Sequence, residues 1–254
     1  MGPYRASNDG QTLIENHDAW NKFSNVIYIE SPVNVGYSYV SDGKKVSAGD
    51  NQTADENYAA MKSFFLKHPK FRYHSVYLVG ESYSGIYVPT LYKRVSDGQK
   101  DFPINLKVSK LQPNTEFYFA YDIIRTCDHN AVKAITRNAG LLYSPLPTML
   151  NKGSGECYNT NGIYTYMNRK DVRSALNIPE RLGTWELCND KISYQWQYDD
   201  VSQFIKEALG EGVRVLMFYG DTDAVCNFIH GQRFAESLGF PVKLTFKCTN
   251  IFFK

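Results

Sequence analysis

A serine that follows an apolar run is the first residue in this sequence whose setting indicates chemistry. Ser82 lies in the stretch YLVGESYSGIYVP, where β-forming residues end at Gly80 and small residues follow the serine. A strand, a sharp turn with a serine at its apex and then a helix expose the hydroxyl as a nucleophile, and small neighbours are needed because the turn is strained. The downstream glycine, Gly85, comes one residue later than in the usual spacing. The pattern predicts a nucleophilic Ser82, and the alternative is an ordinary serine in a strand-to-helix turn.

A serine nucleophile also needs a base and an acidic residue that orients this base. The apolar run VRVLMFYG ends at GDTD, which offers Asp221 and Asp223 as the acidic residue. One histidine follows Asp223, and this is His230, seven residues along and inside a predicted helix. The other histidines precede both aspartates: His17, His68, His74 and His129. In the chain order Ser, Asp, His, the base is expected on a separate loop after a further strand, and no histidine of this sequence stands there.

Three apolar runs predict the strands that would position these residues, and they cover residues 25–31, 75–80 and 213–220. Short runs that end in Gly, Ser, Pro or Asp are typical of buried parallel strands. Ser82 would follow the second strand, and Asp223 would lie at the carboxyl end of the third strand, its neighbour in the sheet. The expected fold class is therefore α/β, with a mostly parallel sheet and helices on both faces.

Helices are predicted between and after these strands. The segment 53–69 repeats apolar residues every three or four positions, at Ala54, Tyr58, Met61 and Phe65. A second helix is predicted after Asn168, which would cap it, and Pro179 would stop it. A third helix is predicted from Asn227 to near Gly239.

The length of 254 residues fits one α/β domain that spans 1–254. Residues 108–155 show no clear alternation and contain SPLPTMLNKGSG, which predicts an insertion or irregular cap. The core would then consist of 1–107, with the serine turn, and 156–254, with the aspartate loop.

Composition excludes several classes of function. Lys and Arg total 28 against 26 Asp and Glu, a net charge of +2, so no nucleic-acid partner is expected. No apolar run approaches the roughly 18 residues of a membrane-spanning helix, so no membrane span is expected. The five cysteines form no C-x-x-C pair, which argues against a metal site, and nothing in the sequence indicates a cofactor.

Four segments together resemble the serine carboxypeptidases, the family of lysosomal cathepsin A and of vacuolar enzymes from yeast and plants. They are NVIYIESPVNVGYSY, VYLVGESYSGIYVPTL, YMNRKDVRSALNIPE and VLMFYGDTDAVCNFIHGQRF. The resemblance implies the α/β-hydrolase fold and the release of C-terminal residues from peptides through an acyl-enzyme. It also implies peptide or protein C-termini as substrates and a lysosomal, vacuolar or secreted location, although the N-terminus MGPYRASNDG lacks the features of a signal peptide.

The resemblance assigns roles residue by residue. Ser82 would attack the scissile carbonyl, and Asp223 would orient the histidine that accepts the serine proton, which leaves Asp221 a structural role in the turn. The backbone N–H of Tyr83 would donate to the oxyanion. Glu81 resembles the carboxyl group that, when protonated, hydrogen-bonds the free C-terminal carboxylate of a peptide. The alternative for Glu81 is a surface ion pair.

The resemblance also concerns cysteines and a glycosylation sequon. Cys226 matches a family cysteine beside the catalytic aspartate and is expected to be free. Cys188 would pair with a cysteine of an upstream family segment that does not occur in this sequence, which leaves Cys127 and Cys157 as the expected pair. Asn51 begins the sequon Asn-Gln-Thr, where family members often carry sugar.

Two family motifs do not occur in the 254 residues. One is W-L-N-G-G-P-G-C-S-S, which supplies a second oxyanion donor, and the other is G-A-G-H-M-V-P, which carries the histidine. We therefore expect an incomplete α/β-hydrolase domain, truncated at both ends and with a shortened cap, that is not a competent peptidase. After residue 107 the sequence VSKLQPN departs from the family, so a central strand is expected to be lost. The alternative is a non-catalytic homologue that binds peptides or other proteins.

Overall fold

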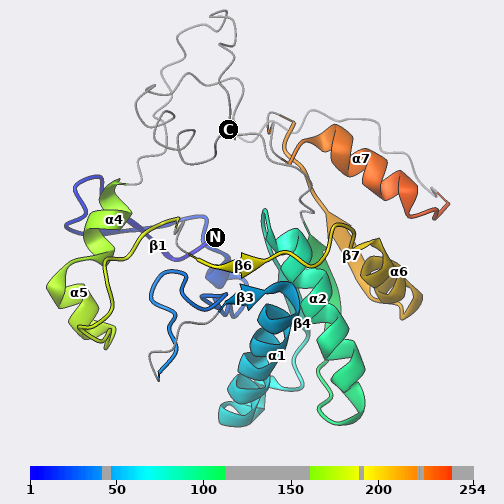
Figure 1. Cartoon of the computed structure of the whole chain (residues 1–254), viewed down its shortest axis with the longest axis horizontal. Coiled ribbons are helices and arrows are strands. Elements are labelled where there is room, and N and C mark those ends of the chain that lie inside the picture. Colours follow the sequence, from blue (N-terminus) through cyan, green and yellow to red (C-terminus); the bar gives the residue numbers. More distant parts are fainter. Residues whose placement is uncertain (42–46, 112–160, 189–191, 222, 224–225, 242–254) are drawn as a thin grey trace, which may run out of the picture.

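A computed structural model describes residues 1–41, 47–111, 161–188, 192–221, 223 and 226–241 of the chain (Figure 1). The described helices are α1 (Asp50–Lys67), α2 (Ser84–Asp97), α4 (Asn161–Met167), α5 (Lys170–Ala175), α6 (Ser202–Gly210) and α7 (Phe228–Ser237). The described strands are β1 (Tyr4–Ala6), β2 (Leu13–Glu15), β3 (Ala48–Gly49), β4 (Val76–Val79), β5 (Leu106–Leu111), β6 (Tyr194–Gln195) and β7 (Arg214–Met217). Three short 3₁₀ turns complete this part of the chain: η1 (Trp20–Lys22), η2 (Pro69–Phe71) and η3 (Gly98–Lys100).

A three-stranded parallel sheet with the order β4-β5-β7 forms the centre of the described fold. Val108 of β5 lies opposite Tyr77 of β4 on one side and opposite Arg214 of β7 on the other. The strand that was expected to be lost is therefore present. It also separates the strand before Ser82 from the strand before Asp223, so these two strands are not direct neighbours.

Strand β5 was not recognised as a strand from the sequence pattern, and the reason is physical. Polar residues at Lys107, Ser109 and Lys110 interrupt the apolar run by which a buried strand is recognised. The strand also crosses residue 107, so the insertion predicted at 108–155 begins inside a strand of the core. The other residues of this insertion that follow β5, up to 155, lie outside the described part of the chain.

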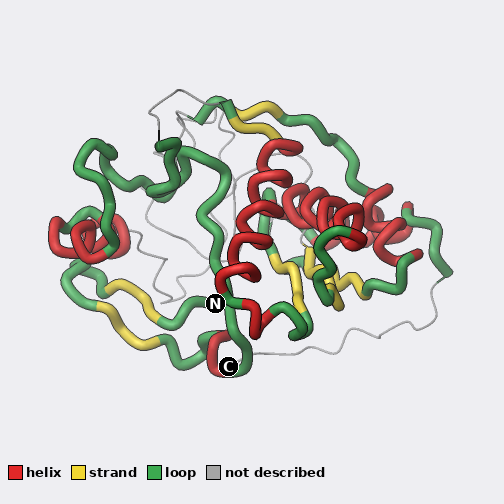
Figure 2. Tube along the Cα trace, turned by 90° about the horizontal axis from the view of Figure 1, so that it is seen from below, coloured by secondary structure: helices red, strands yellow, loops and turns green. Residues whose placement is uncertain are grey.

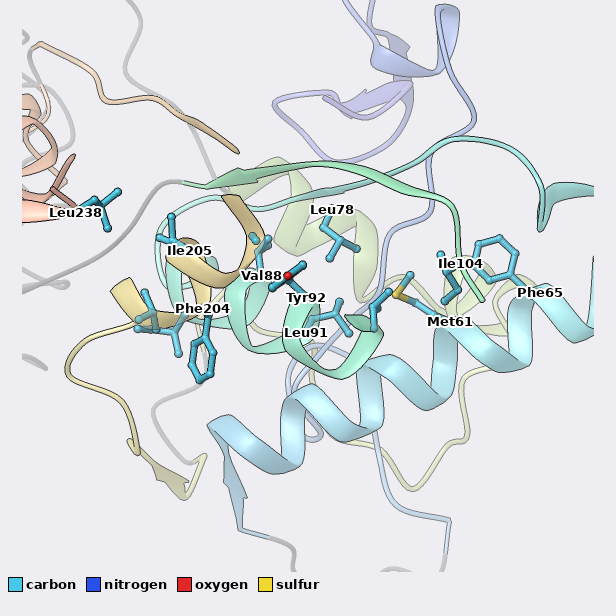
Figure 3. Packing of buried hydrophobic residues seen from close by; sticks show 14 residues of the cluster. Met61, Phe65, Leu78, Val88, Leu91, Tyr92, Ile104, Phe204, Ile205 and Leu238 are labelled. Atoms are coloured by element: carbon cyan, nitrogen blue, oxygen red, sulfur yellow. The ribbon is translucent and has the colours of Figure 1, made fainter. Parts of the chain in front are cut away.

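Helices α1, α2 and α6 pack on one face of this sheet (Figure 3). Leu78 of β4 is buried in the apolar core, together with Met61 from α1 and Phe204 from α6. Helices α1 and α2 lie side by side, so α1 reaches the core partly through α2 (Figure 1). Parallel strands connected through helices confirm the predicted α/β fold class.

The opposite face of the sheet is exposed in the described part of the chain. Side chains alternate along a strand, so the neighbours of buried Leu78 point to this face. Tyr77 is 54% exposed, Val79 is 42% exposed, and Leu216 of β7 is 53% exposed. Within the described residues, the three helices named above thus cover one face of the sheet.

Two small strand pairs lie apart from the parallel sheet (Figure 2). Strands β1 and β2 form an antiparallel pair, and β3 and β6 form a parallel pair that joins residues 48–49 to 194–195. Neither pair was predicted. The strand predicted at 25–31 is wrong, because residues 25–30 form no described strand ladder and Ile27, Tyr28 and Ile29 are exposed.

Two of the predicted helices are confirmed, and the third is short and has a different N-cap. Helix α1 confirms the helix predicted at 53–69, with Ala54, Met61 and Phe65 buried. Helix α7 confirms the helix after Asn227, whose side-chain oxygen caps it by accepting the N–H of His230 at 3.0 Å. The helix near residue 168 is the short α5, and its N-cap is Arg169 rather than Asn168. The Asn168 side chain instead accepts the N–H of Trp185 and donates to the Trp185 carbonyl.

Candidate active site

Ser82 stands at the apex of a sharp turn between β4 and α2. Its φ of +56° lies in the left-handed region, which residues other than glycine seldom adopt. Such strain is typical of functional sites, and it is the backbone geometry of a nucleophile elbow. Gly80 is required by the same turn, because a Cβ atom at this position would lie 2.2 Å from the Cβ of Ser84. The sequence therefore folds locally as the serine pattern predicted.

The backbone hydrogen bonds of this turn do not engage the N–H of the residue that follows Ser82. The N–H of Ser84 donates to the Glu81 carbonyl at 3.1 Å, and the N–H of Gly85 donates to the Ser82 carbonyl at 2.8 Å. The N–H of Tyr83 has no acceptor within the part of the chain that the structure describes. In α/β-hydrolases the residue after the nucleophile supplies an oxyanion donor, and this stays the role predicted for the Tyr83 N–H.

Asp223 follows β7, the strand at the other side of β5. Because the strands are parallel, the turn after β4 and the loop after β7 lie at the same edge of the sheet. One carboxylate oxygen of Asp223 accepts the N–H of Cys226 at 3.0 Å, which fixes the side chain within its own loop. Asp223 is half-buried, and Asp221 is exposed.

The thiol of Cys226 is influenced by carboxylates from both the aspartate loop and the serine turn. Cys226 is 4% exposed, and its burial raises the pKa of the thiol to about 11. The carboxylates of Asp223 and then of Glu81 act in the same direction, because each disfavours a thiolate. Both carboxylates therefore lie within electrostatic reach of one buried sulfur, although they are 142 positions apart in the chain.

Glu81 itself is exposed beside the turn, where its carboxyl group can meet a ligand. The structure describes no ion pair for Glu81 with a lysine or arginine of the described ranges. The role of Glu81 in binding a ligand stays a prediction.

The described histidines lie on other elements. His230 occupies the first turn of α7, and its backbone N–H is held by Asn227. His68 follows α1, and His74 precedes β4, at the end of the sheet opposite to Ser82. His17 follows β2 in a connecting segment, and His129 lies outside the described residues.

Neither Cys188 nor Cys226 forms a disulfide bond with a cysteine of the described residues. The expected pair of Cys127 and Cys157 lies outside the described residues. No group of three or more His, Cys, Asp and Glu side chains in the described ranges could hold a metal ion. Among the described helices, none is both long and apolar enough to span a membrane.

Asn51 lies in the first turn of α1. Its side-chain oxygen accepts hydrogen bonds from Arg94 at 2.9 Å and from Tyr198 at 2.7 Å. Glycosylation uses the amide nitrogen, which is the other end of the same group, and Asn51 is partly exposed. The third residue of the sequon, Thr53, is fully buried in the helix.

Asp50, whose side chain bonds to Tyr83 in the serine turn, was not predicted from the sequence. Its carboxylate is fully buried and accepts four hydrogen bonds, one of them from the phenol of Tyr83. An acidic residue before a helical pattern is ordinary in a sequence, because it stabilises the helix N-terminus. The sequence carried no signal for its role, because only the fold brings Tyr83 and Tyr194 together beside it.

A strained serine between a parallel strand and a helix, with an aspartate loop at the same sheet edge, defines the α/β-hydrolase class. The chain belongs to the serine carboxypeptidase family: the family model described as serine carboxypeptidase matches residues 1–112 and 109–251.

Curated relatives agree with this assignment. The chain is 29% identical to a serine carboxypeptidase of Caenorhabditis elegans, over 95% of this chain and 66% of the relative. It is 30% identical to the lysosomal protective protein of Mus musculus, over 93% of this chain and 67% of the relative. The chain thus spans about two thirds of the length of these relatives.

A solved structure shows the same fold. It is that of Kex1(delta)p, a prohormone-processing carboxypeptidase from Saccharomyces cerevisiae. The TM-score is 0.66, the identity is 14%, and the match covers 93% of this chain and 64% of that chain.

Proposed function

We propose that this chain supplies the nucleophile turn and the aspartate loop of a serine-type carboxypeptidase, which releases C-terminal residues from peptides. The strained turn at Ser82 carries this proposal, because it combines a partly exposed serine with the unengaged N–H of Tyr83. Family membership supports the same assignment.

Each residue then has one role in the reaction. The oxygen of Ser82 attacks the scissile carbonyl, while a histidine takes its proton and Asp223 holds that histidine in the productive tautomer. The N–H of Tyr83 stabilises the negative charge that develops on the carbonyl oxygen. Glu81, exposed beside the turn, hydrogen-bonds the free carboxylate of the substrate when it carries a proton. The acyl-enzyme on Ser82 is finally hydrolysed by water.

The 254-residue polypeptide is proposed to lack this activity when it acts alone. Its one histidine after Asp223 is His230, and His230 belongs to the helix that begins at the same loop. A serine hydroxyl is a poor nucleophile until a base takes its proton. In subtilisin, loss of the histidine alone lowers turnover by roughly a millionfold.

The test uses the purified 254-residue protein. We expect no detectable release of C-terminal residues from a blocked dipeptide near pH 5, and little labelling of Ser82 by a fluorophosphonate probe. Strong labelling that is abolished by Ser82→Ala and by His230→Ala would overturn the proposed inactivity and make His230 the base. The matched control is His74→Ala, because His74 lies before β4 at the far end of the sheet.

Peptide binding without turnover is the second candidate, and the position of His230 in α7 favours it. A peptide with a free C-terminal carboxylate would then bind more tightly than the same peptide with a C-terminal amide, and Glu81→Ala would remove the difference. Equal binding of the two peptides would exclude this candidate. The location proposed for the protein is lysosomal, vacuolar or secreted. The name of the mouse relative supports the lysosomal option, because it describes that protein as lysosomal.

A further inference from the structure

We infer that Asp50 is a positioning residue for the oxyanion donor of the serine turn. Its buried carboxylate holds the side chain of Tyr83, and the backbone N–H of the same residue faces the developing charge. The inference deepens the proposed function and rests on it.

Four donors surround the carboxylate of Asp50. One oxygen accepts the phenol of Tyr83 at 2.8 Å and the phenol of Tyr194 at 2.7 Å. The other oxygen accepts the backbone N–H of Gln197 at 2.7 Å and that of Tyr198 at 3.2 Å. A carboxylate offers about four acceptor sites, so the hydrogen-bonding capacity of Asp50 is filled.

These hydrogen bonds stabilise a carboxylate that has no contact with solvent. The exposed fraction of Asp50 is 0%. The guanidinium of Arg94 bonds to Asp55 and to Asn51, the residue after Asp50. Hydrogen bonds to an ionised acceptor are stronger than neutral ones, and the N-terminus of α1 adds its dipole. The arrangement therefore resists displacement of either phenol.

The anchored phenol ring and the backbone N–H donor both belong to Tyr83. Tyr83 directly follows Ser82 and is the N-cap residue of α2, with φ −58° and ψ −15°. Its ring packs edge-on against Tyr87 and Tyr194, with centroids 4.9 and 5.7 Å apart. With both the ring and the helix start fixed, little freedom remains for the N–H between them. An oxyanion donor must lie within a few tenths of an ångström of its working position.

Burial raises the pKa of the Tyr83 and Tyr194 phenols, and the hydrogen bond to Asp50 acts in the same direction. Both phenols therefore stay protonated and remain donors to the carboxylate at physiological pH. The anchor is thus permanent under the conditions in which the serine turn would work.

The two tyrosines provide a matched pair of variants. Tyr83→Phe removes the anchor of the turn and keeps the ring, whereas Tyr194→Phe removes a bond to the same carboxylate oxygen but leaves the turn attached. Both changes remove one oxygen, so both proteins are expected to fold. Asp50→Asn serves as a third variant, because it keeps the volume but places an NH₂ group among N–H donors.

The measurement is the NMR order parameter of the residue-83 amide in the 254-residue protein, labelled with ¹⁵N-tyrosine and ¹⁵N-phenylalanine so that this amide is read in every variant. We expect the order parameter of the residue-83 N–H to fall from about 0.85, typical of rigid backbone, to below about 0.6 in Tyr83→Phe. In Tyr194→Phe it should stay near the value of the unsubstituted protein, and amides remote from the turn, such as that of Tyr37, should not respond in either variant.

Equal order parameters of the residue-83 N–H in both variants, or a uniform decrease at all labelled amides, would overturn the inference, because each indicates a merely structural role. A selective decrease at residue 83 in Tyr83→Phe and in Asp50→Asn supports it. The measurement requires no turnover, so the result is independent of the labelling assay that tests the proposed function.

Discussion

The phenolic oxygen of Tyr83 lies 2.8 Å from a carboxylate oxygen of Asp50, although 33 positions separate the two residues in the chain. This bond links the residue after Ser82 to the first residue of α1. Asp50 also accepts from Tyr194, which lies in β6, so three segments of the chain meet at one carboxylate. The geometry of the serine turn therefore depends on residues that lie outside the turn.

Replacing Asp50 with alanine should destabilise the fold strongly. The change leaves two phenols and two backbone N–H groups without their acceptor in a buried site, and each unsatisfied group costs about 1–3 kcal/mol. We expect a loss of about 3 kcal/mol or more in the free energy of unfolding, measured by urea denaturation. Asp55→Ala is the control, since Asp55 is exposed and its ion pair with Arg94 contributes little. Equal losses in the two variants would contradict the burial argument.

Gly80→Ala should damage the serine turn. The added methyl group would lie 2.2 Å from the Cβ of Ser84 and 2.9 Å from a methyl carbon of Val88. Overpacking of this kind costs about 2 kcal/mol, so thermal unfolding should occur at a lower temperature. Gly210→Ala is the matched control, because nothing lies within 4 Å of a Cβ atom there. A Gly80→Ala protein as stable as the control would show that the turn relaxes freely.

The two described cysteines should differ in reactivity. Cys188 is exposed, whereas Cys226 is buried and has a thiol pKa raised to about 11. A raised pKa leaves less thiolate at a given pH, and the thiolate is the reactive form. In the native protein at pH 8, iodoacetamide should therefore modify Cys188 first, as peptide mass mapping would show. The rate at Cys226 should increase as the pH rises from about 8 toward about 11, and a rate that is constant over this range would disprove the assignment.

Asn51 should carry a glycan when the protein passes through a secretory pathway. Its amide oxygen faces inward to Arg94 and Tyr198, so the amide nitrogen is the atom left for the sugar. Digestion with peptide N-glycosidase should lower the apparent mass of the secreted protein. Thr53→Ala should abolish the mass shift, and Thr53→Ser should keep it. An undigested mass equal to that of the bacterially produced protein would refute the modification.

How much of this fold the sequence predicts depends on how local each signal is. The turn at Ser82 and helix α1 were predictable, because a glycine-flanked serine and a 3.6-residue period are properties of adjacent residues. The cap of α7 by Asn227 is equally local. By contrast, β5 contains polar residues and is identified as a central strand only by its partners β4 and β7.

The same reasoning explains what was wrong or missed around the site. The apolar run at 25–31 has the composition of a strand, but a strand also needs a neighbour, and composition does not reveal one. The role of Asp50 depends on Tyr83, Tyr194 and the 197–198 backbone, which no short pattern connects. Asn168 was predicted as a cap and instead binds Trp185, because tertiary hydrogen bonds compete with local ones.

The exposed apolar face of the sheet affects how molecules of this protein associate in solution. Tyr77, Val79 and Leu216 form an apolar area on strands that lie on either side of β5. A net charge of +2 gives little repulsion between molecules, so there is little electrostatic barrier to their contact. Added salt then has little repulsion to screen. The solubility of the chain should respond to temperature and to mild detergent much more than to ionic strength.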